Sequence, residues 1–338
     1  MEIISDLTKP LAYKNPVVTI GNFDGVHLGH QKIFKEVVAK AEEIGGTPIA
    51  ITFHPHPARV LAPERGLKMI NTPDDKETLI ERAGINTLIR ISFNRDFAHT
   101  DPDAFIQNIL VDMIGAKWII VGHSYAFGKG KRGTTSMLRF RGRKYGFKTH
   151  VVRYAKIHDD VVSSSRIRSL LHRGRVCEAS SMLGRAYHIS GTVIKGSGKG
   201  GPLLNTPTAN ITTPNELIPR EGVYAVRVSF RCRNRDAVNR SSALCPLSFA
   251  LCPPSSEVFD GVANIGSNPT FGEGTTSYEV HIFGYNKNLV GEHLSIHFID
   301  RIREEKKFDS VQDLKNHIDD DIRQAKRILS SRKDRLFL

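Results

Sequence analysis

The sequence has no hydrophobic run long enough to cross a lipid bilayer, although 40% of its 338 residues are hydrophobic. Its first ten residues, MEIISDLTKP, lack the basic start and the apolar core of an export signal. The four cysteines form no Cys-x-x-Cys pair, so the sequence predicts neither a zinc site nor a disulfide framework. These absences predict a cytoplasmic protein with reduced thiols and no membrane partner.

Acidic residues are outnumbered by basic ones: 35 aspartates and glutamates against 48 lysines and arginines give a net charge of +13. Such a charge suits a nucleic-acid-binding protein and equally a protein that handles several phosphorylated ligands. The basic clusters are not interleaved with aromatic residues, as a base-stacking platform would require. We therefore expect phosphorylated small molecules and no nucleic acid as partners, with a basic nucleic-acid-binding protein as the alternative.

The stretch 17–34, VVTIGNFDGVHLGHQKIF, predicts a strand, a glycine-rich turn and a helix in succession. A helix that begins after such a turn points its free N–H groups and its positive dipole end at a bound phosphate. His27 and His30 are one helical turn apart, so both imidazoles can face the same phosphate, and Gly29 leaves room for a close approach. No Gly-Lys-Ser/Thr follows, so this is not a Walker loop. The plain alternative is a tight turn with two surface histidines.

Short apolar runs alternate with helical patterns from residue 17 to about residue 155. The strand candidates are 17–20, 49–53, 88–91, 118–121 and 151–152. Thr72 and Thr100 are expected to cap two helices, because each precedes a first turn with a proline and has an acidic residue three positions later. The second of these helices should bury an apolar face over 105–113. Strands that alternate with helices predict a Rossmann-like domain, a parallel sheet with helices on both faces.

Two loop segments fall where such a sheet binds its ligand: 121–130, VGHSYAFGKG, and 163–168, SSSRIR. The hydroxyl and N–H groups of the second can bind triphosphate oxygens, and Arg168 can neutralise charge on the leaving pyrophosphate. Taken alone, a serine cap before an arginine is only the start of a helix. His54 and His56 flank a proline in extended chain and point apart, so we expect a loop wall of the nucleotide site and no transition metal.

The pattern changes near residue 186, which we take as the boundary between domains 1–186 and 187–338. Beyond it, short alternating runs with turn signals predict a small antiparallel β-barrel. The polar segment 231–258 is expected to be a long hairpin loop. A final helix is predicted after Ser310, and its apolar face should pack on the barrel. That face consists of Val311, Leu314, Ile318, Ile322, Ala325 and Leu329.

The barrel domain has a candidate phosphate site of its own. The turn 196–201, GSGKGG, is basic, and its backbone N–H groups can surround phosphates, although such a turn taken alone is a plain loop. Thr208 and Asn210, within Pro-Thr-Ala-Asn, offer a hydroxyl and an amide oxygen side by side. Hard oxygen ligands of this kind suit a Mg²⁺ ion that keeps most of its waters and bridges nucleotide phosphates.

Together, the two halves resemble the bacterial bifunctional riboflavin kinase/FMN adenylyltransferases, or FAD synthetases. In the first half the resemblance rests on GNFDGVHLGH (21–30), TFHPHP (52–57), VG-x₄-FGK (121–129) and SSSRIR (163–168). In the second half it rests on GTVIKGSGKG (191–200), PTANI (207–211), GVYAV (222–226), VANIGSNPTF (262–271), YEVHIF (278–283) and IREEKKF (302–308). These motifs occur in one order and cover nearly the whole chain, which makes the resemblance specific.

The resemblance implies two reactions that use ATP with Mg²⁺. The barrel would transfer the γ-phosphoryl group of ATP to riboflavin and release FMN and ADP. The N-terminal domain would then join FMN to the AMP part of a second ATP and release FAD and pyrophosphate. In the first reaction Glu279 would accept the proton of the riboflavin hydroxyl, while Thr208 and Asn210 would hold Mg²⁺. Taken alone, Glu279 is an outward-facing surface carboxylate.

The resemblance also implies which residues bind each substrate. The catalytic residues of the second reaction would be His27, His30 and Arg168. The residues that bind ATP in the N-terminal domain would be Gly21, Asn22, Phe23, Asp24, Gly29, Ser164 and Ser165. The residues that bind ATP in the barrel would be Gly196, Ser197, Gly198, Lys199 and Gly200. The residues that bind the flavin would be Ser124, Tyr125 and Arg303.

The chain departs from the family pattern at a few positions. Asn205 stands where the family usually has glycine, and asparagine tolerates a positive φ better than most residues. Ser124 and Tyr125 stand where the family has Asn-Phe or Asp-Phe, and Ser165 replaces a typical threonine but keeps the hydroxyl. These departures bear on the alternative that only one of the two activities is retained. A different acceptor, such as a pantetheine or nicotinamide mononucleotide, is disfavoured by the Pro-Thr-Ala-Asn segment and the strand that contains Glu279.

Overall fold

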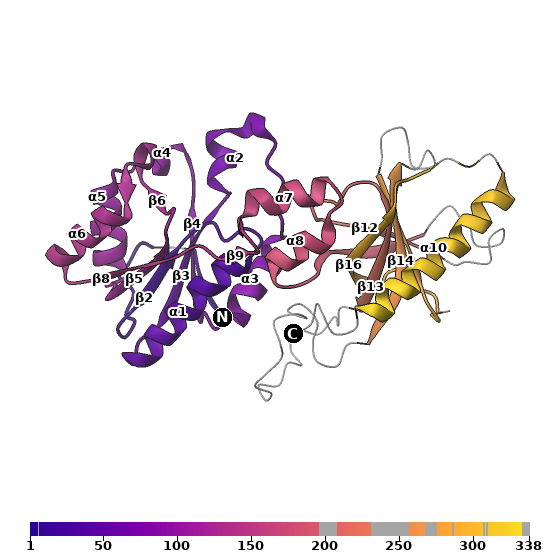
Figure 1. Ribbon diagram of the computed structural model, residues 1–338. Coiled ribbons are helices and arrows are strands. Elements are labelled where there is room, and N and C mark those ends of the chain that lie inside the picture. The colour runs from indigo at the N-terminus through magenta and orange to yellow at the C-terminus, as the bar shows by residue number, and fades with distance from the viewer. Residues whose placement is uncertain are drawn as a thin grey trace. The chain divides into compact units, whose positions relative to one another are not determined.

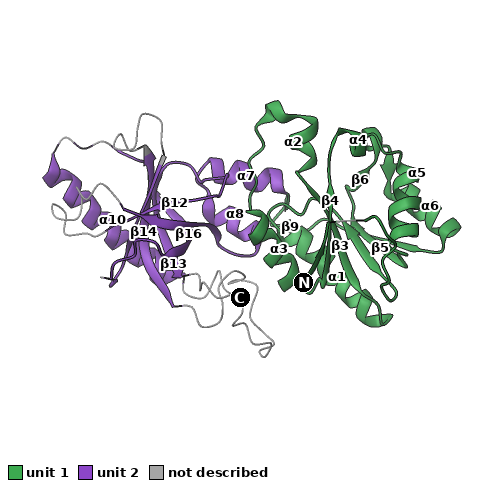
Figure 2. Cartoon of the chain, turned by 180° about the vertical axis from the view of Figure 1, so that it is seen from behind, with its two compact units in different colours: residues 1–163 green, residues 164–338 purple. Residues whose placement is uncertain are grey.

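A computed structural model describes residues 1–5, 7–195, 208–230, 257–267, 276–285, 287–306, 308 and 310–332. The chain divides into two compact units, residues 1–163 and 164–338, which Figure 2 shows in different colours. Each unit has its own sheet and its own hydrophobic core, so each is described by itself. Within the described residues no helix is both long and apolar enough to cross a membrane.

The first unit contains a parallel six-stranded sheet with the order β1-β4-β3-β2-β5-β8 (Figure 1). Its strands are β1 (Glu2–Ile4), β2 (Val17–Ile20), β3 (Pro48–His54), β4 (Thr87–Ser92), β5 (Trp118–Gly122) and β8 (Lys148–Val152). All five strands predicted from the sequence are present; the structure adds β1, a mostly exposed edge strand of three residues. The chain runs from β2 to β3 and β4 on one side and later to β5 on the other. The carboxyl end of β2 is therefore at the switch point where such sheets bind ligands.

Helices and short ribbons connect these strands. The helices are α1 (Leu28–Glu43), α2 (Pro57–Leu61), η1 (Pro63–Arg65), α3 (Pro73–Arg82), α4 (Arg95–Ala98), α5 (Pro102–Ala104), η2 (Phe105–Met113), η3 (Lys129–Lys131) and α6 (Thr135–Tyr145). The ribbons are β6 (Ala126–Phe127) with β7 (Gly133–Thr134), and β9 (Lys156–Ile157) with β10 (Asp160–Val161). Thr72 caps α3 as predicted, because its hydroxyl accepts from the Asp75 N–H at 3.2 Å. The predicted Thr100 cap is wrong: Asp101 caps α5 by accepting from the Asp103 N–H at 2.9 Å.

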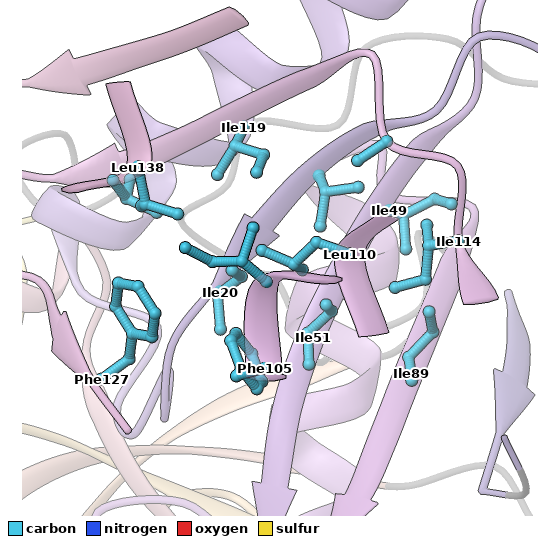
Figure 3. Packing of buried hydrophobic residues seen from close by; sticks show 14 of the residues in the cluster. Ile20, Ile49, Ile51, Ile89, Phe105, Leu110, Ile114, Ile119, Phe127 and Leu138 are labelled. Carbon is cyan, nitrogen blue, oxygen red and sulfur yellow. The ribbon is translucent and has the colours of Figure 1, made fainter. Parts of the chain in front are cut away.

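The core of this unit lies between the sheet and η2, a π-helix over the apolar stretch 105–113. Figure 3 shows strand side chains such as Ile20, Ile51 and Ile89 facing Phe105 and Leu110. Alternate residues of β2 on the other face are also fully buried, and α1 packs against β2, β3 and β5. Burial of each such side chain contributes about 1.5–3 kcal/mol. The predicted sheet with helices on both faces is confirmed.

The second unit begins with α7 (Ser164–His172) and α8 (Val176–Leu183) and continues into a closed antiparallel barrel. Its strands close in the order β11 (Tyr187–Ile194), β12 (Ala209–Thr212), β15 (Thr276–Ile282), β14 (Val258–Ser267), β13 (Gly222–Phe230) and β16 (His293–Arg303). The predicted barrel is confirmed. Inward-facing aromatic side chains fill it, since the Tyr224 and Phe298 rings meet edge to face at 5.2 Å.

The last helix, α10 (Val311–Ser331), lies diagonally across the barrel strands in Figure 1. Ser310 caps it by accepting from the Asp313 N–H at 3.1 Å, as predicted. Ala325 and Leu329 are fully buried against the outer face of the barrel. Val311 was expected on this face, but it is 56% exposed. It is the first residue of the helix, so its side chain lies beyond the part that packs on the barrel.

The two compact units meet at 163/164, whereas the sequence places the boundary between the two catalytic halves at 186/187. The second boundary concerns function and stays a prediction. Of the predicted loop 231–258, residues 231–256 lie outside the described residues, and β14 begins at Val258. The turn 196–200 and Asn205 also lie outside them.

Candidate active sites

The turn between β2 and α1 has an unusual backbone. Phe23, Gly25 and Val26 have φ values of 51°, 86° and 40°. Non-glycine residues rarely adopt this left-handed region; each such residue costs about 1–3 kcal/mol and persists only where the surrounding structure enforces it. The turn brings the first residues of α1 directly to the carboxyl end of β2, where their free N–H groups are available to an anion.

His27 and His30 form a stacked pair at the start of α1. Their ring centroids are 3.6 Å apart and the rings are inclined by 17°. His27 is the N-cap, and its Nδ1 accepts from the His30 N–H at 3.4 Å, so a neutral His27 carries its proton on Nε2. An ideal Cβ on Gly29 would lie 3.1 Å from the His27 ring. Glycine at this position therefore allows the His27 ring to lie over the first turn of the helix, while the close approach of a ligand at Gly29 stays a prediction.

The environment of His30 keeps its ring uncharged. Burial lowers the pKa of His30 well below its usual value of 6.5, and the nearby His27 and Lys76 lower it further. Its buried Nδ1 has no hydrogen-bond partner among the residues that the structure describes. A neutral imidazole with an unpaired buried nitrogen is suited to exchange a hydrogen bond with a ligand.

Other predicted ATP-binding residues in the turn have clear structural contacts. Asp24 is 4% exposed, and its carboxylate accepts from the Ile70 N–H at 3.0 Å. Phe23 is fully buried and packs on Phe34, so only its backbone is available at the turn. The Asn22 carbonyl accepts from the hydroxyl of Thr52, at 3.3 Å. An ideal Cβ on Gly21 would lie 2.9 Å from the Phe23 ring.

Sequence reasoning missed Lys76 and the hydroxyl of Thr52. The Lys76 ammonium donates to Thr52 Oγ1 at 3.2 Å, next to the turn that precedes α1. A signal was available, since Lys76 follows the Thr72 cap by four residues and so lies on the same face of α3. Thr52 lies near the carboxyl end of its strand, but the periodicity of the sequence does not show that Lys76 of α3 contacts it.

The remaining predicted residues of this unit lie at the loops after β3 and β5. Ser124 is exposed, and the Tyr125 ring stacks on Phe127 at 5.5 Å. Burial raises the pKa of Tyr125, whose hydroxyl has no partner among the described residues. His56 caps α2 by accepting from the Ala58 N–H at 3.1 Å. No cluster of three metal-ligating side chains occurs within the described parts of the chain.

Ser164, Ser165 and Arg168 lie in the first turns of α7, the helix that opens the second compact unit. The helix begins at the serine segment, as the sequence indicates. Their predicted role at the triphosphate stays a prediction.

In the barrel, the strand register brings two predicted residues together. Asn210 of β12 is the cross-strand partner of Glu279 of β15, so both side chains share one face. Asn264 of β14 lies opposite Glu279 on the other side. The neighbouring Val280 faces the barrel interior and is 1% exposed, which places the carboxylate and the amides on the outer face.

Asn210 is the buried member of this group. It is 9% exposed, and its Oδ1 has no hydrogen-bond partner among the described residues. Thr208 is exposed and directly precedes β12, two residues before Asn210. A hydroxyl, an amide oxygen and a carboxylate therefore lie within a few residues of one another on adjacent strands. Leaving a buried acceptor unpaired costs about 1–3 kcal/mol, which a ligand that donates or coordinates would recover.

Arg303, a predicted flavin-binding residue, has a structural contact. Its guanidinium pairs with the Asp321 carboxylate of α10 at 2.8 Å, and it lies 5.5 Å from the ring centroid of Phe308. Because Asp321 is buried, this ion pair fastens the end of β16 to α10. A flavin contact of Arg303 stays a prediction.

Comparison with known proteins shows which family each half of the chain matches. Residues 9–166 match the family model of FAD synthetase, and residues 183–329 match that of riboflavin kinase. A bifunctional riboflavin kinase/FMN adenylyltransferase of Haemophilus influenzae is 32% identical over 93% of this chain and 94% of its own length. The chain belongs to the bifunctional riboflavin kinase/FMN adenylyltransferase family. The enzyme of this family from Bacillus subtilis is 34% identical over 93% of both chains.

The family assignment agrees with the fold. A crystal structure of a protein from Streptococcus pneumoniae, named macrolide-efflux protein, is 27% identical and superimposes with a TM-score of 0.81. The match covers 96% of this chain and 98% of that one, so both units recur together in one solved structure. The FAD synthetase match contains the His27–His30 pair, and the riboflavin kinase match contains Asn210 and Glu279.

Proposed function

We propose that this chain makes FAD from riboflavin in two ATP-dependent steps. The barrel phosphorylates riboflavin to FMN, and the α/β unit transfers the AMP part of a second ATP to FMN. The observation that carries the proposal is that one chain contains two candidate groups of residues, the stacked His27–His30 pair at a helix start and the cross-strand pair Asn210–Glu279. Family membership supports both activities.

In the first step the 5′-hydroxyl oxygen of riboflavin attacks the γ-phosphorus of ATP. The bond from that phosphorus to the β,γ-bridging oxygen breaks, and ADP leaves. Glu279 accepts the hydroxyl proton as the oxygen becomes bonded to phosphorus. Catalysis of this kind depends on positioning and on neutralisation of phosphate charge. The basic turn 196–200, proposed to bind the phosphates, lies outside the described residues.

In the second step a phosphate oxygen of FMN attacks the α-phosphorus of ATP, and pyrophosphate leaves with the bridging oxygen. No proton has to be removed from the attacking phosphate when it is ionised. His27 and His30 are instead proposed to donate hydrogen bonds to the α-phosphate oxygens, for which a neutral ring is sufficient. Ser164, Ser165 and Arg168 are proposed to bind the rest of the triphosphate.

The barrel residues fit a Mg²⁺ ion, because the buried Oδ1 of Asn210 has no partner among the described residues and Thr208 adds a hydroxyl. When bound there, Mg²⁺ would offset the negative charge of the ATP phosphates. Asn210→Ala is expected to raise the Mg²⁺ concentration for half-maximal FMN formation about tenfold or more. The measurement is a Mg²⁺ titration of FMN formation. Asn288→Ala, in an exposed loop of the same unit, serves as the control. An unchanged Mg²⁺ requirement in Asn210→Ala would contradict this ligand assignment.

Gly29→Ala tests whether the position of the His27 ring matters for activity without lowering the stability of the fold. The new Cβ would displace the His27 ring by a few tenths of an ångström, so FAD formation should fall about tenfold. The unfolding temperature should not fall, because alanine has a higher helix propensity than glycine. Rates of FAD and FMN formation and a thermal melt check both points, with Lys35→Ala on the exposed face of α1 as the control. Full FAD formation in Gly29→Ala would show that the ring position does not matter.

The whole proposal is tested by incubating the purified protein with riboflavin, ATP and Mg²⁺ and separating the flavins. FMN should appear first and FAD second. Formation of FMN without FAD would show that only the kinase activity is retained. This is the relevant alternative because Ser124 and Tyr125 differ from the family pattern in the N-terminal domain. A cytoplasmic location, the absence of a nucleic-acid partner and the predicted flavin contacts remain part of the proposal.

A further inference from the structure

Lys76 holds a defined position at the edge of the sheet where the histidine pair lies. It is in the second turn of α3, and its Nζ is 3.2 Å from Thr52 Oγ1. Thr52 is fully buried near the carboxyl end of β3, and its hydroxyl donates to the Asn22 carbonyl in the turn before α1. The hydroxyl therefore donates to the turn and accepts from the ammonium, which fixes the ammonium beside the turn.

The start of α3 is itself tied to the same turn. Asp24 accepts from the Ile70 N–H at 3.0 Å, and the Thr72 cap begins the helix two residues later. The first contact fixes the start of α3 against the turn and the second fixes the first turn of the helix, so the backbone position of Lys76 follows from the fold. Its partial burial distinguishes it from the exposed lysines of α1, such as Lys35.

The hydrogen bonds of Lys76 are incomplete. An ammonium group has three N–H donors, and among the residues that the structure describes Thr52 Oγ1 is the one acceptor within hydrogen-bond distance of Nζ. Two donors are thus available in a partly buried position, where unpaired donors are costly. The unpaired Nδ1 of His30 is a second, independent sign that this edge is built to bind a polar ligand.

Lys76 lies among charged groups of both signs. Burial lowers the pKa of Lys76, the carboxylates of Asp24 and Glu77 raise it, and Arg90 lowers it. The charge of Lys76 in turn acts on His30, together with His27. An incoming phosphate would favour the charged ammonium and satisfy its free donors at the same time.

We propose that Lys76 is a further substrate-binding residue of the adenylyltransferase site, which donates its two remaining N–H groups to a phosphate oxygen. The proposal rests on the proposed adenylyl transfer, and it adds a cation from α3 to the donors at the start of α1. Two phosphate sources share this chemistry, the triphosphate of ATP and the phosphate of FMN. The experiment is arranged to tell them apart.

The test compares the steady-state kinetics of FAD formation from supplied FMN in the full chain and in Lys76→Met. Loss of a charged hydrogen bond to phosphate should lower kcat/KM about tenfold or more for the substrate that Lys76 contacts. A raised KM for ATP identifies the triphosphate, and a raised KM for FMN identifies the flavin phosphate. Lys76→Arg should retain more activity than Lys76→Met, and Lys35→Met should behave as the unchanged chain. FMN formation by the barrel should be unaffected.

Lys76→Gln is the second variant in case Lys76→Met fails to fold, because its amide can still donate to Thr52 without the charge. Unchanged kcat/KM for both substrates in a folded Lys76→Met or Lys76→Gln protein would overturn the proposal. An equal loss in Lys35→Met would also overturn it, since the effect would then be one of overall charge.

A readout that does not need turnover separates this proposal from the proposed function. The imidazole signal of His30, assigned with His30→Gln, is followed by NMR as a function of pH in the full chain without substrates. Removing the positive charge in Lys76→Met should raise the pKa of His30 toward its usual value, while burial and His27 still hold it below 6.5. An unchanged titration would overturn the placement of the ammonium beside His30. Absence of FAD formation in the unchanged chain would instead refute the proposed function.

Discussion

Glu279→Gln is expected to lower the rate of FMN formation about 10²- to 10⁴-fold while FAD formation from supplied FMN continues. Glutamine keeps the size of the side chain opposite Asn210 but cannot accept the proton of the riboflavin hydroxyl. The strand register should survive because the substitution is on the outer face of the barrel. The measurement is flavin separation after parallel incubations with riboflavin and with FMN.

The control for this prediction is Glu292→Gln, an exposed glutamate just before β16 in the same unit. It should leave both activities unchanged. If Glu279→Gln formed FMN at the full rate, the carboxylate would not be the proton acceptor. If Glu279→Gln also abolished FAD formation from FMN in a folded protein, the assignment of the two reactions to separate halves of the chain would be wrong.

His30→Ala should have the opposite effect, a loss of FAD formation of about 10²- to 10³-fold with FMN formation unchanged. The reason is that the ring is held uncharged and stacked on His27 where the α-phosphate is proposed to bind, so its hydrogen bond is made in the transition state. FMN should then accumulate when riboflavin and ATP are supplied. His99→Ala, which replaces an exposed histidine at the end of α4 in the same unit, provides the matched comparison. FAD formation at an undiminished rate in His30→Ala would rule out a role for this ring.

Several of the arginines have a structural role. Several arginines pair with carboxylates in the described residues, including Arg90 with Glu77 at 3.2 Å, Arg227 with Asp260 at 3.3 Å and Arg332 with Asp300 at 2.7 Å. Arg227 also donates to the Leu329 carbonyl, which ties the barrel to α10. These guanidinium groups are engaged within the fold, but each pair joins one positive and one negative group, so the pairs leave the net charge of +13 unchanged.

Local patterns in the sequence were sufficient to predict most of the helices and strands of both units. The strand, turn and helix over 17–34 follow from apolar runs and glycine positions, and the caps at Thr72 and Ser310 follow from side chains that bond N–H groups three residues later. The barrel strands follow from alternation of inward and outward residues. The Thr100 cap failed because two adjacent residues can each act as a cap, and only the backbone conformation selects Asp101.

What the sequence by itself determined was the pair of folds and the family, and it proposed candidate residues for two phosphate sites, because all of these depend on short-range periodicity and on contiguous motifs. Only the tertiary structure decided that Asn210 lies opposite Glu279, that Lys76 reaches Thr52, and that Arg303 is paired with Asp321. Each of these contacts joins segments far apart in the chain. Strand register, helix docking and ion pairing between such segments are set by packing of the whole unit, which no local pattern encodes.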